Sequence, residues 1–303
     1  MNISEIKNSI LNEINKQRQN AINQAEQNKH LAYENQEYLN LANELGGLKI
    51  DLAKARINGI KEEKILVQMD SVNKKMTLLL KEMGFADSDL TPQFDCKICK
   101  DEGRLSNGEY CNCFKQRLAK KLNDINGVLE DIEFKDCDKQ PENLMEKLEK
   151  ICISFPNLKF NKIILSGASG VGKTRIAQAI TNYFIKKDFV ALFISSARLN
   201  QDFLNYHLAS IEEKQSIFEP LLTSDLLIVD DIGAEPKLKN VTNEYLLYLI
   251  NSRNQKDKLT IFTTNLTPEA ILNIYDERIF SRMFDKSKSI PILISGQDKR
   301  INV

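Results

Sequence analysis

The stretch KIILSGASGVGKT, residues 162–174, decides how this chain folds. Its first part, Ile163–Leu165, is a run of three apolar residues that predicts a short buried strand. Residues 167–174 then follow the spacing G-x-x-x-x-G-K-T. Apolar residues recur after them at helical spacing, at Ile176, Ile180, Tyr183 and Phe184. The sequence therefore predicts a strand, a glycine-rich turn and a helix, in that order.

The turn has the form of a phosphate-binding loop. Glycine has no Cβ, so the backbone can aim successive N–H groups inward at phosphate oxygens. The helix that follows adds the positive end of its dipole. Lys173 is expected to reach the β- and γ-phosphates of ATP, and the Thr174 hydroxyl to complete the coordination of Mg²⁺. The residues expected to contact the nucleotide are Gly167, Ala168, Ser169, Gly170, Val171, Gly172, Lys173 and Thr174.

A second apolar run, LLIVDD at residues 226–231, ends in two acidic residues. Beside a phosphate loop, Asp230 is expected to hold Mg²⁺ together with Thr174, directly or through water. Asp231 is expected to polarise the attacking water, a role more often given to the longer Glu. Glu235 is a weaker candidate for the same work. The alternative, a pair of solvated carboxylates at a strand end, is disfavoured by the phosphate loop.

Two polar residues near strand ends are candidate nucleotide sensors. Asn265 closes the run LTIFTTN, residues 259–265, where its amide can hydrogen-bond the γ-phosphate or the lytic water. Without the other motifs, an Asn in this place would be an ordinary turn residue. Arg300 follows Gly296 after the last expected strand and is a candidate for a second sensor on the same nucleotide.

Arg278 and Arg282, in ERIFSRMF, lie four residues apart and so project from one face of a helix. One or both could reach the γ-phosphate held by a neighbouring subunit and stabilise charge in the transition state. The alternative is surface ion pairing with Asp276 and Glu277.

From Phe160 onward, apolar strand patterns alternate with helical ones. This alternation predicts an α/β domain with a parallel sheet and helices on both of its faces. Five strands are expected, at residues 163–165, 190–195, 226–231, 259–265 and 290–295.

The segment CKICKDEGRLSNGEYCNC, residues 96–113, carries two pairs of cysteines. Asn107-Gly108 predicts a tight two-residue hairpin turn, which would bring the second pair back beside the first. Four thiolates close a tetrahedral site with no open position, as in structural zinc sites. An iron–sulfur cluster lacks its usual ligand run here, and four unligated thiols so close together are disfavoured. The expected zinc ligands are Cys96, Cys99, Cys111 and Cys113.

Residues 1–85 are expected to be helical and largely solvated, with the polar part up to about Gln36 frayed or disordered. Apolar residues spaced by threes and fours in 38–57 and 61–83 predict a helical hairpin. Gly46-Gly47 is expected to kink or weaken its first helix. The hairpin is either a structural pair or a surface that packs on another chain. The basic segment 114–122 is interpreted as a solvated helix face, with phosphate contact as the alternative.

The composition excludes a strong overall electrostatic field, because positive and negative charges are equal in number. Forty-two basic residues balance 42 acidic ones, so DNA contact must come from a local patch or an assembled ring. The N-terminus lacks the pattern of a signal peptide, and no run approaches the ~20 apolar residues that span a bilayer. Cys137 and Cys152 stand apart from the cysteine cluster. A cytoplasmic protein with no membrane partner is expected.

Residues from about 95 to 303 resemble the DnaC/DnaI-type replicative helicase loaders, an IstB/DnaC-like branch of the AAA+ ATPases. The matching motifs are GASGVGKT, LLIVDDIGAE, TIFTTNL, ERIFSRM and the terminal GQDKR. The cysteine segment resembles the zinc module that precedes the ATPase domain in some members. Its C-x-C pair departs from the mixed Cys/His ligand set of some loaders. Residues 1–36 carry no motif that we assign to a known family.

The resemblance implies roles for individual residues. Lys173 and Thr174 would bind ATP–Mg²⁺, and Asp230 and Asp231 would form the acidic strand end. Asn265 would be the first sensor, Arg282 the arginine finger that acts on a neighbouring subunit, and Arg300 the second sensor. Three domains are expected: a helical region at 1–85, a zinc-ribbon-like module with its basic helix at 86–122, and an AAA+ domain at 123–303.

The function expected from the resemblance is an ATP-dependent loader, a weak ATPase alone and more active after assembly or on DNA. Its partners would be a hexameric replicative helicase, single-stranded DNA and further copies of itself through the ATPase domain. Two alternatives stay open. One is an IstB-like transposition helper, and the other is a nucleotide-binding adaptor with little hydrolysis.

Overall fold

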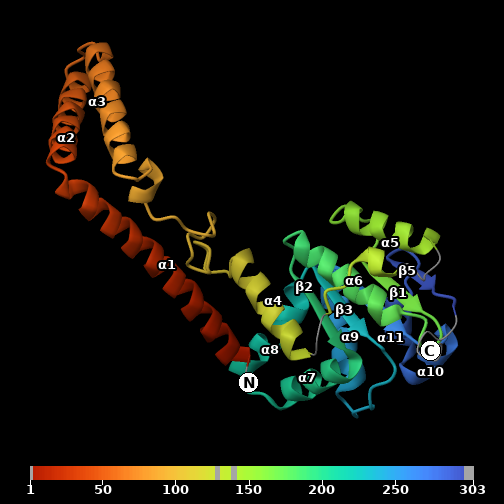
Figure 1. The fold of residues 1–303 in the computed structure, drawn as a ribbon. Helices are drawn as coiled ribbons and strands as arrows, with labels where there is room; N and C mark the ends of the chain where they lie inside the picture. The colour runs from red at the N-terminus through yellow and green to blue at the C-terminus, as the bar shows by residue number, and fades with distance from the viewer. Residues whose placement is uncertain (1–2, 127–129, 138–141, 297–303) are drawn as a thin grey trace. The chain divides into compact units, whose positions relative to one another are not determined.

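A computed structural model describes residues 3–126, 130–137 and 142–296 (Figure 1). The chain forms two compact units. The larger consists of Met1–Ile10 and Tyr110–Val303, and the smaller of Leu11–Glu109. The division into three domains at residues 85 and 122 stays a prediction.

The larger unit is built on one parallel five-stranded sheet, which confirms the predicted fold class. The strand order is β2-β3-β4-β1-β5, so β1 lies between β4 and β5. Each strand falls within about two residues of its expected position. The strands are β1 (Lys162–Ser166), β2 (Ala191–Ser195), β3 (Leu226–Asp230), β4 (Leu259–Thr264) and β5 (Ser289–Leu293).

Helices cover both faces of the sheet because alternate residues of each buried strand point to opposite sides (Figure 1). Leu227 and Val229 pack on one face, whereas Leu226 and Ile228 pack on the other. The first face is covered by α7 (Ser196–Leu208), α8 (Ile211–Thr223), α9 (Thr242–Gln255), α10 (Pro268–Ile274) and α11 (Glu277–Met283). The second is covered by α5 (Glu142–Ser154), the short helix η2 (Phe134–Cys137) and α6 (Lys173–Lys186).

The free edge of β2 is covered by α4 (Asn112–Asn126). An uncovered edge strand presents unpaired backbone groups, which promote pairing with other chains. Here the buried amide of Asn123 pairs with that backbone. It donates to Ala191 O at 3.0 Å, and its Oδ1 accepts from Phe193 N at 2.9 Å. Asn126 adds a bond from its Nδ2 to Phe193 O at 3.2 Å. Two asparagine side chains of α4 therefore take the place of a neighbouring strand.

The amino ends of the central strands are closed by a buried arginine, Arg253 of α9. Its guanidinium donates to the carbonyls of Leu221, Ser224 and Leu259 at 2.6, 3.1 and 2.6 Å, and to the Thr260 hydroxyl at 2.8 Å. Burial lowers the pKa of this group, but every contact that holds it is an acceptor suited to the cation.

The smaller unit contains α2 (Gln36–Ile57) and α3 (Glu63–Glu82), which pack on each other and confirm the predicted helical hairpin. The helix α2 continues through Gly46-Gly47, and the kink or weakening expected there stays a prediction. The short helix η1 (Asp87–Leu90) follows. Among the described residues, no helix is both long and apolar enough to cross a membrane.

The polar stretch up to about Gln36 is expected from the sequence to be frayed or disordered. It instead forms part of α1, one helix from Ile3 to Glu34, so that expectation is wrong. Its buried residues include small ones, Ala25 and Ala32, which carry little hydrophobic signal in the sequence. Polar side chains add contacts within the unit: Asn28 Nδ2 donates to Asp89 O at 2.9 Å. Contacts with residues later in the chain therefore stabilise α1, whose polar sequence has few hydrophobic residues to bury.

The role of Asn123 predicts a stability effect. Asn123→Leu keeps the approximate volume but leaves two backbone groups of β2 without their partner. Each buried unsatisfied group costs about 1–3 kcal/mol, so we expect the free energy of unfolding to fall by about 2–6 kcal/mol in urea titrations. Gln116→Leu on the same helix, which loses only a surface contact to Asp188 O, should cost less than about 1 kcal/mol. Equal effects of the two changes would contradict the edge role of Asn123.

Candidate nucleotide site and cysteine cluster

The phosphate loop connects the end of β1 to the start of α6. Gly170 and Gly172 have φ angles of 74° and 99°, a left-handed backbone that favours glycine. Gly167 is constrained by space instead, because a Cβ there would lie 2.3 Å from the carbonyl oxygen of Ile294. The first turn of α6 thus begins at Lys173 with its N–H groups facing the loop.

The amine of Lys173 is buried against this loop. Its Nζ donates to Gly167 O at 2.8 Å, to Ala168 O at 2.7 Å and to the amide oxygen of Asn265. The amide nitrogen of Asn265 in turn donates to Asp231 Oδ1 at 2.8 Å. Three residues predicted from separate motifs are therefore joined in one chain of hydrogen bonds.

The carboxylate of Asp230 forms a second group with two hydroxyls. Thr174 Oγ1 lies 3.2 and 3.0 Å from the two oxygens, and Thr263 Oγ1 donates to Oδ1 at 2.6 Å. Burial raises the pKa of Asp230, and both hydroxyl contacts oppose that rise. A threonine hydroxyl beside a buried carboxylate is a donor set that fits Mg²⁺, a cation that prefers oxygen ligands.

Thr263 belongs to the cluster around the two acids, although it was not among the residues predicted from the sequence. Its hydroxyl donates to Asp230 and also accepts from the backbone N of Asp231 at 2.8 Å, so it orients both acids. Asp231 itself has a left-handed φ of 58°, which is uncommon outside glycine and typical of strained functional turns. A threonine near the end of an otherwise apolar strand was the signal available in TIFTTN.

The arginines of α11 lie apart from this cluster. Arg278 pairs with Asp276 at 2.8 Å and approaches Glu244 at 3.8 Å. The surface ion pair with Asp276 is therefore the one that the alternative interpretation expected, whereas the second partner is Glu244 and not Glu277. Arg282 is exposed, and within the described ranges it has no hydrogen bond or ion pair. Its charge acts near Lys162, at the amino end of β1, where burial lowers the lysine pKa and Arg282 adds to that effect. Arg300 lies outside the described residues.

Glu235 is not placed to polarise water. Its carboxylate is buried, where it accepts from Gly233 N at 2.8 Å and from the Tyr275 hydroxyl, and it pairs with Lys237 at 3.4 Å. The carboxylate of Glu235 is thus held by Gly233 and Tyr275, whereas that of Asp231 contacts Asn265 in the nucleotide cluster.

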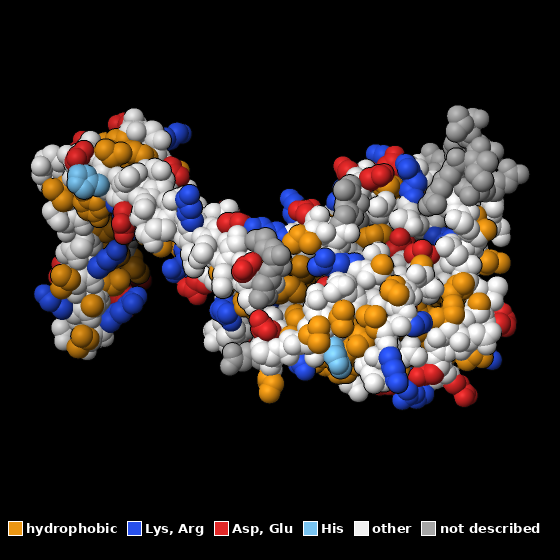
Figure 2. Space-filling view, turned by 90° about the horizontal axis from the view of Figure 1, so that it is seen from below, with side chains coloured by type: hydrophobic (Ala, Val, Ile, Leu, Met, Phe, Trp, Pro, Cys, Tyr) orange, Lys and Arg blue, Asp and Glu red, His pale blue; other side chains and the backbone are white. Residues whose placement is uncertain are grey.

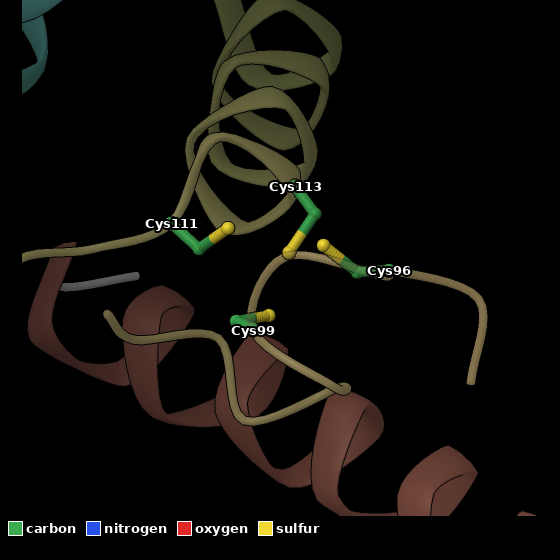
Figure 3. A group of neighbouring side chains, drawn as sticks. All are labelled: Cys96, Cys99, Cys111 and Cys113. Carbon is green, nitrogen blue, oxygen red and sulfur yellow. The ribbon is translucent and has the colours of Figure 1, made fainter. Parts of the chain in front are cut away.

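The four clustered cysteines converge, as the spacing predicted. Their sulfur atoms all lie within 4.8 Å of one another and point toward a common centre (Figure 3). A tetrahedral zinc site with bonds of about 2.3 Å has sulfur–sulfur distances of about 3.8 Å, so the group fits zinc after a small contraction. Cys113 lies in the first turn of α4, and Cys111 directly precedes that helix.

The turn between the cysteine pairs differs from the expected one. Gly108 N donates to Leu105 O at 2.9 Å and Leu105 N to Glu109 O at 2.8 Å, which centres the turn on Ser106-Asn107. Gly108 then takes a left-handed φ of 85°, as in three-residue hairpin loops. The hairpin is therefore confirmed, but its loop is one residue longer.

A buried acid supports the first cysteine pair. The carboxylate of Asp101 accepts from the backbone N of Cys96 at 2.8 Å and of Asp95 at 2.9 Å. Arg18 fixes the same segment by donating to Lys100 O at 3.1 Å and to Glu102 at 3.0 Å. Contacts of this kind orient ligands around a metal site.

Residues 112–288, more than half of the chain, match the family described as "IstB-like ATP binding protein". The chain belongs to this family. As an IstB-like protein it carries an ATP-binding domain over these residues. The family match begins at the start of α4, so the helix that covers the edge of β2 is part of the shared domain.

Curated relatives of this IstB-like chain carry the name "Chromosomal replication initiator protein DnaA". The protein of Mesoplasma florum is 29% identical over 144 residues, which cover 47% of this chain and 32% of that protein. The protein of Mycoplasma capricolum is 30% identical over 195 residues, which cover 58% and 42%. The chain thus spans 32% of the length of the first relative and 42% of the second.

Solved structures similar to this IstB-like protein include a "DnaC helicase loader". That likeness has 23% identity and a TM-score of 0.44, and covers 50% of this chain and 89% of the other. The likeness to the structure named "DnaI" has 20% identity and a TM-score of 0.48, and covers 55% and 93%.

The cysteine geometry predicts a metal content. Purified protein should contain about one zinc per chain by elemental analysis, and Cys96→Ser should lose it because three thiolates bind far more weakly than a closed set of four. Cys152→Ala, a buried cysteine outside the cluster, is the matched control and should keep its zinc. Protein without zinc, or with iron and visible absorbance, would show that this assignment is wrong.

Proposed function

We propose that this chain is an ATP-dependent loader that binds a hexameric replicative DNA helicase and assists its loading onto single-stranded DNA. The proposal is supported by the match of five motifs to the DnaC/DnaI-type loaders and by the names of the curated relatives, which are replication initiators. An ATPase whose finger acts between subunits suits this work, because hydrolysis then depends on assembly.

The position of Arg282 is the observation that carries the proposal. It is exposed in the last turn of α11, and the segment after that helix enters β5 at the amino end of β1, where Lys288 O accepts from Lys162 N at 3.0 Å. The phosphate loop lies at the opposite, carboxyl end of β1. A guanidinium in this place suits the nucleotide of a neighbouring subunit better than its own. Self-association through the ATPase domain follows from that role.

Within one subunit, the chain supplies the remaining groups. Bound ATP–Mg²⁺ supplies the γ-phosphate and the cation that neutralises its charge. Lys173 exchanges its carbonyl partners for phosphate oxygens, and Thr174 and Asp230 hold the cation. Asp231 holds the lytic water, and Asn265 links that carboxylate to Lys173. The shorter reach of Asp than Glu is consistent with slow hydrolysis by an isolated subunit.

The helicase is proposed to bind on the α2–α3 hairpin. Apolar side chains are exposed near its tip: Ile57 is 84% exposed, Ile60 60% and Val67 70%. Figure 2 shows that such side chains lie at the surface of the helical unit among lysine and arginine residues. Exposed apolar residues grouped at one end of a hairpin are typical of a surface that packs on another protein.

An IstB-like transposition helper is the second candidate, favoured by the description of the matched family. A static nucleotide-binding adaptor is less consistent with the site, because the two acids, Asn265 and Arg282 are all present. Capture of a hexameric replicative helicase distinguishes the loader from the transposition helper.

The hairpin assignment predicts a selective loss. Ile57→Asp with Ile60→Asp should reduce co-elution of the full chain with its hexameric helicase at least tenfold, because two apolar contacts become buried charges. ATP binding should stay unchanged. The matched control is Leu272→Asp, an exposed leucine of α10 that should retain the helicase. A wild-type chain that binds no replicative helicase would refute the loader function.

The trans role of Arg282 predicts complementation between two inactive chains. Arg282→Ala should bind ATP but hydrolyse it ~10³–10⁵-fold more slowly in the assembled state, the usual cost of losing such a finger. Lys173→Ala should bind no ATP, since its phosphate loop lacks the cation. Mixing the two should restore some turnover, because Lys173→Ala chains donate Arg282 to sites that still hold nucleotide. Persistent inactivity despite demonstrated co-assembly would show that the finger does not act in trans.

A further inference from the structure

Three side chains outside the nucleotide cluster form a polar group, in which Glu235 and Tyr275 are buried and Lys237 lies beside them at the surface. The Tyr275 hydroxyl donates to Glu235 Oε1, and Gly233 N donates to Oε2 at 2.8 Å. The Lys237 ammonium lies 3.4 Å from Glu235 Oε1 and 3.1 Å from the centre of the Tyr275 ring. Each charged group thus has partners on two sides.

Burial makes the contact between Glu235 and Tyr275 hard to break. Both residues are less than a tenth exposed. Burial also raises the pKa of Tyr275, so its hydroxyl remains a donor at neutral pH. Separating the two side chains would leave a carboxylate without a needed partner in a dry environment, a costly state for a charged acceptor.

This polar group joins the loop that follows Asp231 to the segment that precedes α11, the helix of Arg278 and Arg282. Glu235 lies four residues after Asp231, in the loop that leaves β3. Tyr275 ends α10 and directly precedes Asp276, whose side chain accepts from Ile279 N at 3.0 Å and so caps α11. The same two segments also touch at Gly233, where a Cβ would lie 2.3 Å from Leu266 and 4.0 Å from Ile274.

We propose that Tyr275, through Glu235, is a positioning residue that couples the nucleotide state at the β3 acids to the placement of α11 and its Arg282. A shift of the Asp231 loop on ATP binding moves Glu235, and the buried contact makes Tyr275 and the start of α11 follow. The link carries the state of one subunit's nucleotide to the arginine that the subunit offers its neighbour. That last step rests on the proposed trans role of Arg282.

The test compares Tyr275→Phe with wild type by hydrogen–deuterium exchange of the full chain, with and without ATP–Mg²⁺. In wild type, ATP should slow exchange in residues 167–174 and in α11. Tyr275→Phe loses one hydroxyl, so the first response should remain while the α11 response falls about 5–10-fold. Tyr245→Phe, whose hydroxyl contacts His207 at 2.9 Å, is the matched control and should keep both responses. An α11 response equal to wild type in Tyr275→Phe overturns the proposal, as does a wild type without one.

A second pair of variants separates positioning from simple structural support. Glu235→Gln keeps an oxygen that can accept from Tyr275, so its α11 response should stay within about twofold of wild type. Glu235→Ala removes the acceptor and should lose the response as Tyr275→Phe does. Equal loss in both Glu235 variants, with melting temperatures lowered alike, would assign the group to stability alone.

Turnover in mixed assemblies separates this inference from the proposed function. The link acts only in a donor that holds ATP, so these donors carry Asp231→Asn, which keeps the phosphate loop and Arg282 but lacks the carboxylate proposed to hold the lytic water. Donors with Asp231→Asn and Tyr275→Phe should restore about tenfold less activity to Arg282→Ala chains than Asp231→Asn donors do. Unreduced activity with the doubly substituted donors would contradict coupling to Arg282. If Asp231→Asn donors themselves restore nothing while the exchange response to ATP is intact, the trans finger fails and the link from nucleotide to α11 stands.

Discussion

The buried carboxylate of Asp230 is the interaction on which the nucleotide edge depends. It sits at the end of the interior strand β3 and accepts from two hydroxyls, one from the helix after the phosphate loop and one from β4. Its elevated pKa records the cost of burial, which a cation and hydrogen bonds repay. Because Thr263 also holds the next residue of the acidic pair, one strand end orients both acids.

The fold could be predicted from the sequence because its signals are local. Each buried strand is a short apolar run, and the G-x-x-x-x-G-K-T spacing requires a strand before it and a helix after it. The parallel arrangement then places the ends of β1, β3 and β4 at one edge, which explains why Lys173, Asp231 and Asn265 meet. The cysteine pairs met for a similar reason, through a short hairpin.

The remaining features depend on contacts that no local pattern encodes. Asn123 looks like an ordinary helix residue until β2 is placed beside it. Thr263 is typical of a strand, and its pairing with two acids follows only from the register of β3 and β4. The helix α1 looked too polar to be ordered because its buried positions include alanines and its partners lie much later in the chain.

The sheet is closed differently at its two ends. At the amino ends, Arg253 joins the chain before β3 to the start of β4, and Asn161 beside β1 bonds to Asn254 and Asp257. At the carboxyl ends the strands run into loops with left-handed backbone, at Gly170 and Asp231. Side-chain hydrogen bonds therefore hold the amino ends of the strands to α9 and the turn after it, whereas the carboxyl ends lead into the phosphate loop and the loop of Asp231. A displacement caused by a bound nucleotide would thus fall on these loops before it reached the strands.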